Sequence, residues 1–380
     1  MSGFSRMTRR NFVAKSTGAA LAAPMIGRSA YAFTAAPDRV YSRRAVDLVA
    51  ASLVIDMLAP LKIDISDSYY TREMPAGDKD EFRGCGITGF HNAWGIGGPD
   101  AYQDVLANFA GWQGFAARNA DIFSAAGKVG DLDAAKADGK CCVIMGIQNS
   151  EHFRSVEDVA FFHGLGQRVS QLTYNAQNLL GSGSTERVDG GVTDFGAAII
   201  AEMEKTGMLV DTSHCGDRTT LDAIDIASGP IAITHSNCRA LVDHPRVKTD
   251  EAIRALAAKG GVMGISGVSM FIKDRDPTTI GDLVDHIDHV RDLVGIDHVG
   301  IGSDADLNGY DDMPPDQYAA LKASYKGSYA FRDKIDVAGF DHPKKIFDLT
   351  EELIRRNYTD EHIALVLGGN FRRLLATVWR

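Results

Sequence analysis

The sequence predicts an α/β fold, a TIM-type (β/α)8 barrel, on three observations. Short apolar runs recur along the chain, segments of helical periodicity alternate with them, and polar side chains follow several of the runs. Short, continuous apolar runs are typical of strands that are buried on both faces of a parallel sheet. Eight such runs alternating with helices favour a barrel, and an open doubly wound sheet is the alternative.

The expected strands are short. They cover residues 52–57, 86–91, 142–147, 168–173, 208–213, 231–235, 261–266 and 298–303. No Gly-x-Gly-x-x-Gly motif follows the first of them, which argues against a dinucleotide-binding sheet. The adjacent Cys141 and Cys142 enter the third run, where we expect them to be small buried hydrophobic residues and not a disulfide.

The helices between the strands have recognisable ends. Residues 195–206 form one helix, which Thr193 or Asp194 caps and Gly207 ends. Residues 279–293 form another, because apolar side chains recur there at helical spacing.

The remaining segments complete one domain. A polar, Tyr-rich stretch over 306–343 is expected to be a long loop after the eighth strand, and 346–379 is expected to be two helices that close the barrel. No linker, internal repeat or low-complexity tract interrupts the chain, so residues 33–380 are predicted to form a single barrel.

Composition excludes several classes of protein. The 380 residues carry a net charge of −10, which weighs against a nucleic-acid-binding surface. No apolar run approaches the ~18 residues that a spanning helix needs. Five Cys in a chain of this length do not make a disulfide-stapled module.

The first 32 residues have the pattern of a targeting segment. The pair Arg9-Arg10 precedes Phe12, a modest apolar stretch follows, and Ala30-Tyr31-Ala32 resembles a small-x-small cleavage site. The pattern resembles a twin-arginine export signal, so we expect a periplasmic protein that is exported after it has folded. A disordered basic N-terminus is the alternative.

Polar side chains stand where strands end, and the C-terminal ends of barrel strands are where chemistry occurs. They are His91, Gln148, Tyr174, His214, His235 and Asp304. Two His on adjacent strands can bind Zn²⁺, and a nearby carboxylate can take a proton from a water molecule that the metal activates. Each residue alone also has an ordinary explanation, as a hydrogen-bonded structural side chain.

Longer motifs carry a family resemblance. They cover residues 190–196 with 207–214, residues 234–240 with 244–246, residues 299–306, and residues 353–359 with 369–373. In this order they resemble the membrane (renal) dipeptidase family, peptidase family M19 of the amidohydrolase superfamily. The resemblance implies a (β/α)8 barrel with two zinc ions that hydrolyses dipeptides and tolerates a D-residue at the second position.

The resemblance also implies roles for residues that this chain keeps. His214 and His235 match the two later His that hold the second metal ion. Asp304 matches the Asp that shuttles a proton, and Arg246 matches the Arg that binds the substrate carboxylate. The resemblance further allows a homodimer.

The chain departs from the family at the positions that hold the first metal ion. Leu58 and Pro60 stand where the family has the His and Asp of its first strand, and neither side chain can bind a metal. Gln148 replaces the shared Glu, so a neutral amide oxygen takes the place of a carboxylate. Tyr174 replaces the substrate-contacting His after the fourth strand.

These departures lead to two hypotheses. In the first, the protein is a dipeptidase-like metallohydrolase with one Zn²⁺ on His214, His235 and Gln148, while Asp304 is catalytic. It cleaves an amide bond in a small carboxylated substrate that Arg246, Tyr174 and His91 contact. In the second, the protein is a non-peptidase descendant that binds a small ligand or does metal-free chemistry. Glu151, His152, His91 and Asp56 are considered as substitute ligands for the metal.

Overall fold

The computed structural model describes residues 39–60, 70–310 and 313–379. The predicted export signal, residues 1–32, lies outside these ranges. The strands are β1 (Ile55–Asp56), β2 (Gly89–Trp94), β3 (Phe123–Ala125), β4 (Cys141–Ile147), β5 (Gln167–Gln171), β6 (Leu209–Asp211), β7 (Ala232–Ser236), β8 (Val262–Ile265) and β9 (Val299–Ile301). The α-helices are α2 (Arg43–Ala51), α4 (Ala76–Gly84), α5 (Ala101–Arg118), α6 (Val129–Asp138), α7 (Glu157–Gly164), α8 (Asp194–Thr206), α9 (Asp217–Ile226), α10 (Asp250–Ala258), α11 (Ile280–Val294), α12 (Pro315–Ser324), α13 (Lys345–Arg355), α14 (Asp360–Ala364) and α15 (Asn370–Val378).

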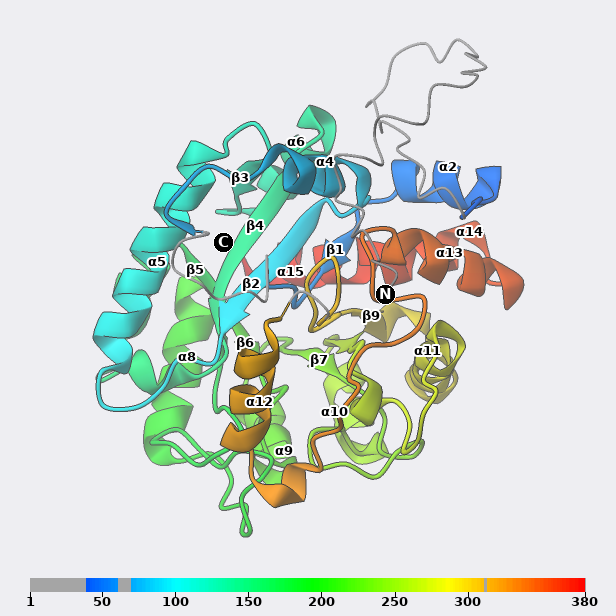
Figure 1. Ribbon diagram of the computed structural model, residues 1–380. Helices are drawn as coiled ribbons and strands as arrows, with labels where there is room; N and C mark the ends of the chain where they lie inside the picture. Colours follow the sequence, from blue (N-terminus) through cyan, green and yellow to red (C-terminus); the bar gives the residue numbers. More distant parts are fainter. Residues whose placement is uncertain (1–38, 61–69, 311–312, 380) are drawn as a thin grey trace, which may run out of the picture. The chain divides into compact units, whose positions relative to one another are not determined.

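Eight of these strands close into a parallel barrel. The sheet runs in the order β2-β1-β9-β8-β7-β6-β5-β4, and a further pairing of β2 with β4 completes the ring. The barrel prediction is therefore confirmed, and the open doubly wound sheet is excluded. The short strand β3 was not predicted; it pairs only with β4, beside the ring. Figure 1 shows the strands around a common centre, with α5, α8, α9, α10 and α11 outside them.

The barrel interior is filled by side chains that alternate along the strands. One buried apolar cluster takes residues from six strands: Ile55, Ile144, Val169, Leu209, Ala232 and Val262. Phe371 and Leu374 of α15 belong to the same cluster and close one end of the barrel. Cys141 and Cys142 are buried in β4 as free thiols, as expected, and the other three Cys are free as well.

Both predicted helices are present, and both have capped N-termini. Thr193 accepts a hydrogen bond from the backbone N–H of Gly196 at the start of α8, and Gly207 ends that helix in a left-handed conformation. Thr279 and Asp282 form a capping box at the start of α11.

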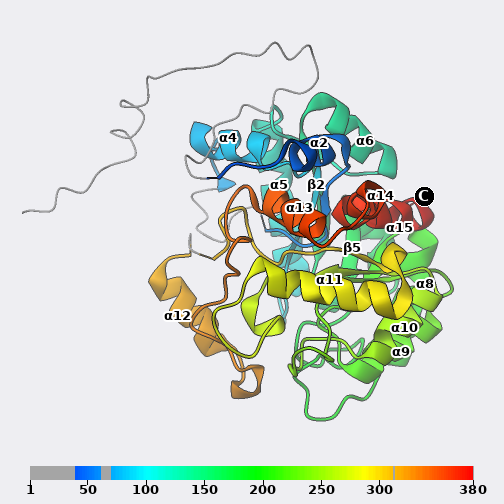
Figure 2. The same cartoon turned by 90° about the vertical axis from the view of Figure 1, so that its right-hand side faces the viewer.

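Two segments differ from the prediction. The expected loop over 306–343 contains the helix α12, and the tail holds three α-helices instead of two. Thr359 caps the additional helix α14, and a π-helical turn over Leu365–Gly369 joins α14 to α15. Figures 1 and 2 together place α12 over one end of the barrel, with α15 towards the opposite end.

No helix among the described residues is long and apolar enough to cross a membrane.

Candidate active site

The C-terminal ends of the strands carry most of the predicted site residues. Gln148 directly follows β4, Tyr174 lies just beyond β5, and His235 is the next-to-last residue of β7. His214 and Asp304 each stand three residues after a strand, β6 and β9. Since parallel strands end at the same rim, these side chains meet at the end of the barrel that α12 covers.

A cavity of about 450 Å³ opens at this rim. Gln148, Tyr174, His214 and Asp304 line it, together with Pro60. His235, Arg246 and His91 are buried beside or beneath it and do not line it. The structure therefore brings four of the seven predicted site residues to the cavity wall.

The centre of the site is a pair of imidazoles. The Nε2 atoms of His214 and His235 lie 3.0 Å apart. The Tyr174 ring stacks on His214, with 4.2 Å between ring centroids and 23° between the planes. Both imidazoles are buried, and Tyr174 covers the one nearer the cavity.

The other ring nitrogens fix the tautomers of both imidazoles. His214 Nδ1 lies 2.8 Å from the side-chain oxygen of Asn175, so Nδ1–H donates to this oxygen. Thr234 donates its hydroxyl proton to the Asp211 carboxylate over 2.7 Å. The Thr234 oxygen then accepts from His235 Nδ1–H over 2.8 Å. Both Nε2 atoms consequently present lone pairs to each other.

Burial keeps these imidazoles neutral. Desolvation lowers the pKa of His214 and of His235 well below the usual value, and the nearby Arg246 guanidinium lowers the pKa of both further. Two facing lone pairs repel each other, and a cation bound to both relieves the repulsion. Two imidazole nitrogens on one tetrahedral Zn²⁺ lie roughly 3.3 Å apart, close to the separation here.

Gln148 supplies a further donor at the same rim. Its side-chain nitrogen donates to the Ala93 carbonyl over 3.0 Å, whereas its side-chain oxygen is buried with no hydrogen-bond partner. An orphaned buried oxygen in the cavity wall fits a role as ligand to a cation. Within the described ranges, no three His, Cys, Asp or Glu side chains are grouped to hold a metal. Among the described residues, the two imidazoles and the amide oxygen of Gln148 are therefore the candidate ligands for one ion.

Apolar side chains follow the first strand. Leu58 is fully buried and Pro60 lines the cavity, so apolar atoms occupy the side of the rim where β1 ends.

Asp304 is the acidic side chain of the cavity wall. Its backbone adopts a left-handed conformation (φ 57°), and its N–H donates to the Leu58 carbonyl over 2.7 Å. Burial raises the pKa of Asp304 to about 7, although Arg246 opposes the increase. A carboxyl group that titrates near neutral pH can both accept and donate a proton under physiological conditions.

His91 does not stand at a strand end, which corrects the sequence-based placement. The strand β2 runs on to Trp94, so His91 lies inside the barrel, level with Ile144 of β4. Its Nδ1 lies 2.8 Å from the Met57 carbonyl, and its buried Nε2 has no partner. The ring fits against Gly146, where a Cβ atom would come within 1.9 Å of Nε2. A role for His91 in substrate binding stays a prediction.

The other substitute ligands do not line the cavity. Asp56 accepts hydrogen bonds from the backbone N–H groups of Leu58 and Ser303 and does not line the cavity. Glu151 accepts from the Gly98 N–H in a loop. Both ring nitrogens of His152 are engaged, one with the Asn149 carbonyl and the other with the Gln167 side chain.

Arg246 is buried below the cavity with no exposed surface. Its guanidinium donates to the backbone carbonyls of Ser213 and His235, and its Nε has no partner. The guanidinium lies 5.2 Å from the centroid of the Phe271 ring. Its predicted contact with a substrate carboxylate stays a prediction.

Sequence reasoning missed several residues of the site. Asn175, which orients His214, directly follows Tyr174 in the sequence, and Asn is common at left-handed positions such as this one (φ 59°). Tyr310, Tyr325 and Tyr329 also line the cavity. They belong to the segment after β9, residues 306–343, which is called the excursion below. The Tyr-rich composition of residues 306–343 was the one sequence feature that could have indicated these residues.

Comparison with known proteins identifies the family. The family model described as membrane dipeptidase (peptidase family M19) matches residues 77–318. Dipeptidase tcpJ of Claviceps purpurea is 28% identical over 262 residues, which are 68% of this chain and 56% of that protein. The uncharacterized dipeptidase C965.12 of Schizosaccharomyces pombe is 32% identical over 257 residues, 66% of this chain and 55% of that protein. The chain thus spans about half the length of the curated relatives it matches.

A solved structure shares the fold. An amidohydrolase from Pseudomonas aeruginosa superposes with a TM-score of 0.77 at 29% sequence identity, covering 88% of this chain and 99% of that chain. Its fold is shared over nearly the whole barrel. With the family model matching well over half of the sequence, the chain belongs to the membrane dipeptidase family, peptidase family M19.

Proposed function

We propose that this protein is a dipeptidase-like metallohydrolase that cleaves the amide bond of a dipeptide or a related small amide with one bound metal ion. The observation that carries the proposal is the facing pair of His214 and His235, whose Nε2 lone pairs converge over 3.0 Å. Membership of the dipeptidase family supports the reaction class, and the orphaned oxygen of Gln148 supports a third ligand.

The residues present would hold one Zn²⁺ through His214, His235 and Gln148. When bound there, such an ion supplies Lewis acidity, which polarises a carbonyl group and makes a water molecule more acidic. Asn175 and Thr234 keep both imidazoles in the metal-binding tautomer.

Asp304 supplies the proton transfers in this proposal. In its carboxylate form it accepts a proton from the attacking water, and it then delivers that proton to the nitrogen of the departing amine. The pKa of about 7 suits both steps, because neither protonation state is costly at neutral pH. Asp304, His214 and Gln148 line the same cavity, so the group that moves the proton and two of the three proposed metal ligands face a common substrate.

A metal-free binding protein is the second candidate. It is favoured by Leu58 and Pro60, which remove two donors of the family's first ion, and by a largely apolar cavity wall. We also propose that the protein works in the periplasm, on the strength of the twin-arginine pattern at Arg9-Arg10.

Metal content and turnover measured on the same sample test the proposal. The protein is stripped with a chelator, reloaded with Zn²⁺, analysed for bound metal and assayed with dipeptides. We expect about one ion per chain and dipeptide hydrolysis, both lost in His214→Ala and retained in His362→Ala, whose side chain does not line the cavity. Absence of bound metal and of turnover after zinc loading would favour the binding protein.

A further inference from the structure

The backbone at Asp304 adopts a conformation that needs support from its neighbours. Its φ of 57° lies in the left-handed region, which residues other than glycine seldom occupy. Such a conformation persists only where the surrounding structure holds it. Among the described residues, no donor is hydrogen-bonded to the Asp304 carboxyl group, so the direction of this side chain depends on how the backbone is held.

Lys345 contacts the residues on both sides of Asp304. It is the first residue of α13, and its side chain is fully buried. Its Nζ donates to the Ser303 hydroxyl oxygen over 3.3 Å, to the Ala305 carbonyl over 3.2 Å and to the Asp306 carbonyl over 2.8 Å. An ammonium group has three protons to donate, so this one short segment after β9 accepts all of them.

The end of β1 holds the same segment from the other side. The Asp56 carboxylate accepts a hydrogen bond from the Ser303 N–H over 2.8 Å, and the Leu58 carbonyl accepts from the Asp304 N–H over 2.7 Å. Burial raises the pKa of the Asp56 carboxyl group, and attraction to the Lys345 ammonium opposes that increase. The segment after β9 is therefore fixed between a buried cation on α13 and a buried carboxyl group on β1.

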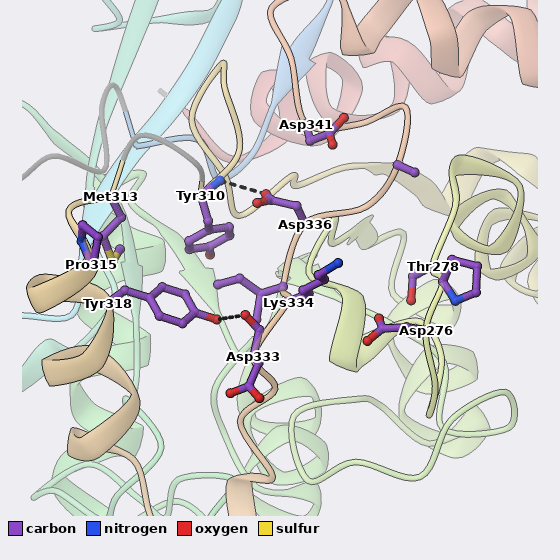
Figure 3. Close-up of a pocket in the computed structure, with 13 residues that line it drawn as sticks. Asp276, Thr278, Tyr310, Met313, Pro315, Tyr318, Asp333, Lys334, Asp336 and Asp341 are labelled. Carbon is purple, nitrogen blue, oxygen red and sulfur yellow. Dashed lines mark hydrogen bonds between the residues drawn. The ribbon is translucent and has the colours of Figure 1, made fainter. Parts of the chain in front are cut away.

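The carbonyl of Asp304 is bonded as well. The Tyr310 hydroxyl donates to it over 2.5 Å. Tyr310 is in turn held through its backbone N–H, which donates to the Asp336 carboxylate over 2.8 Å, as Figure 3 shows. Both backbone polar groups of Asp304 are thus engaged, while its side chain lines the cavity.

The stability of α13 does not explain a lysine at its first position. The N-terminal end of a helix carries a partial positive charge, which disfavours a basic side chain there. Removing an ammonium group from water is also costly, and burial lowers the pKa of Lys345 accordingly. Buried ion pairs often stabilise a fold no better than apolar side chains of the same volume. What Lys345 provides is three directed hydrogen bonds to the residues around Asp304.

From these contacts we propose that Lys345 is a positioning residue for Asp304, because it holds the neighbouring backbone so that the Asp304 carboxyl group faces the cavity. Lys345 does not line the cavity, so it acts through Asp304. The effect on turnover rests on the proposed function, in which Asp304 transfers the proton. The effect on the structure of the segment rests on the contacts alone.

Replacement of Lys345 by Met tests the effect on turnover. Lys345→Met keeps an unbranched apolar side chain and removes the charge and the three donors. In the zinc-loaded protein we expect kcat to fall by roughly tenfold or more, with KM within about twofold and bound zinc unchanged, since misplacing a reacting group slows the chemical step. Lys79→Met is the matched control, because Lys79 is also buried and pairs with Glu73 and Asp121 on another part of the fold. It should leave kcat unchanged, whereas an unchanged kcat in Lys345→Met would overturn the proposal.

A double variant separates positioning from a general structural role. If Lys345 acts through Asp304, adding Lys345→Met to Asp304→Asn should not reduce the residual kcat any further. An equal reduction in both backgrounds would show that Lys345 supports the fold as a whole, and the proposal would be wrong.

Hydrogen exchange followed by mass spectrometry measures the same contacts without turnover. We expect backbone amides of residues 303–306 to exchange about tenfold faster in Lys345→Met, with β6 and β7 unchanged. If Lys345→Met does not fold, Lys345→Gln, which keeps two donors without the charge, should show an increase of about threefold. Unchanged exchange at these residues would overturn the proposal. Faster exchange in the variant of a protein that hydrolyses no dipeptide would instead contradict the proposed function and leave the role of Lys345 intact.

Discussion

The imidazole Nε2 atoms of His214 and His235 face each other across 3.0 Å, each with its Nδ1 proton already donated to a neighbouring side-chain oxygen. The pair is therefore built to share a cation. We expect Zn²⁺ to raise the melting temperature of the chelated protein in a concentration-dependent way, because a ligand that binds only the folded state stabilises it. At a concentration 100 times the dissociation constant the gain is about 2.7 kcal/mol.

The same zinc titration on Asn175→Leu tests whether zinc binding depends on the tautomer of His214 that Asn175 fixes. This variant removes the acceptor of His214 Nδ1–H but leaves both imidazoles in place. Loss of an outer partner of a metal-binding His typically weakens metal affinity about 10–100-fold. Identical zinc responses in Asn175→Leu and the unmodified protein would show that the Asn175 contact does not prepare the site.

Asp304 predicts the pH dependence of turnover. Its pKa of about 7 means that the carboxylate form, which accepts the proton, is lost as the pH falls below neutral. We expect kcat/KM to decline tenfold per pH unit below a midpoint near 7, measured from pH 5 to 9. Asp304→Asn should abolish this acidic limb along with most of the activity. An acidic limb that persists in Asp304→Asn would mean that Asp304 is not the group that titrates.

The carboxyl group of Asp304 should make the folded protein less stable at high pH. Its pKa is higher in the folded chain than the ~3.9 of an unfolded Asp, so the folded state binds more protons between these values. Stability should therefore fall as the pH rises from about 4 to about 7. In the metal-free protein, Asp304→Asn should raise the free energy of unfolding by roughly 1–3 kcal/mol at pH 8 and by less at pH 5. Urea unfolding at the two pH values measures the difference.

The barrel could be predicted from the sequence because its strands are continuous apolar runs, whereas elements without such patterns could not. The strand β3, Phe123–Ala125, is three residues long and pairs with β4 alone. Helix α12 contributes no buried residue, so it lacks the apolar stripe by which a helix is recognised. Its formation depends on the local sequence and on the rim that it covers.

The position of a site residue could be predicted where the residue directly follows a recognisable strand. Gln148, His214 and Asp304 reach the cavity wall because each follows a strand whose end was located to within a few residues. The complete burial of Arg246, near the Phe271 ring, could not be predicted, because it depends on packing between distant segments. His91 was misplaced because β2 continues three residues beyond it.

The hydrogen bond between Tyr174 and Tyr325 should help to hold the excursion against the barrel rim. Tyr174→Phe removes one hydroxyl of the pair at 3.0 Å and keeps the ring that stacks on His214. Net hydrogen-bond contributions are about 0.5–1.5 kcal/mol. We expect trypsin to cut after Lys322 or Lys326 about 2–10-fold faster in this variant, with the unfolding of the whole barrel little changed. Equal cleavage rates would mean that other contacts hold the excursion.

Gly146 and His91 form a matched pair inside the barrel, and their coupling can be measured. A Cβ atom on Gly146 would lie 1.9 Å from His91 Nε2, and the ring cannot simply move away because its Nδ1 is held at the Met57 carbonyl. Gly146→Ala should therefore destabilise the protein by about 1–3 kcal/mol, the usual cost of overpacking a core. In the background of His91→Ala, which removes the ring, the same substitution should cost little. The double-mutant cycle then gives a coupling energy of about 1–3 kcal/mol by urea unfolding. Additive effects would instead show that the ring and Gly146 are not in contact, and that His91 occupies another position in the barrel.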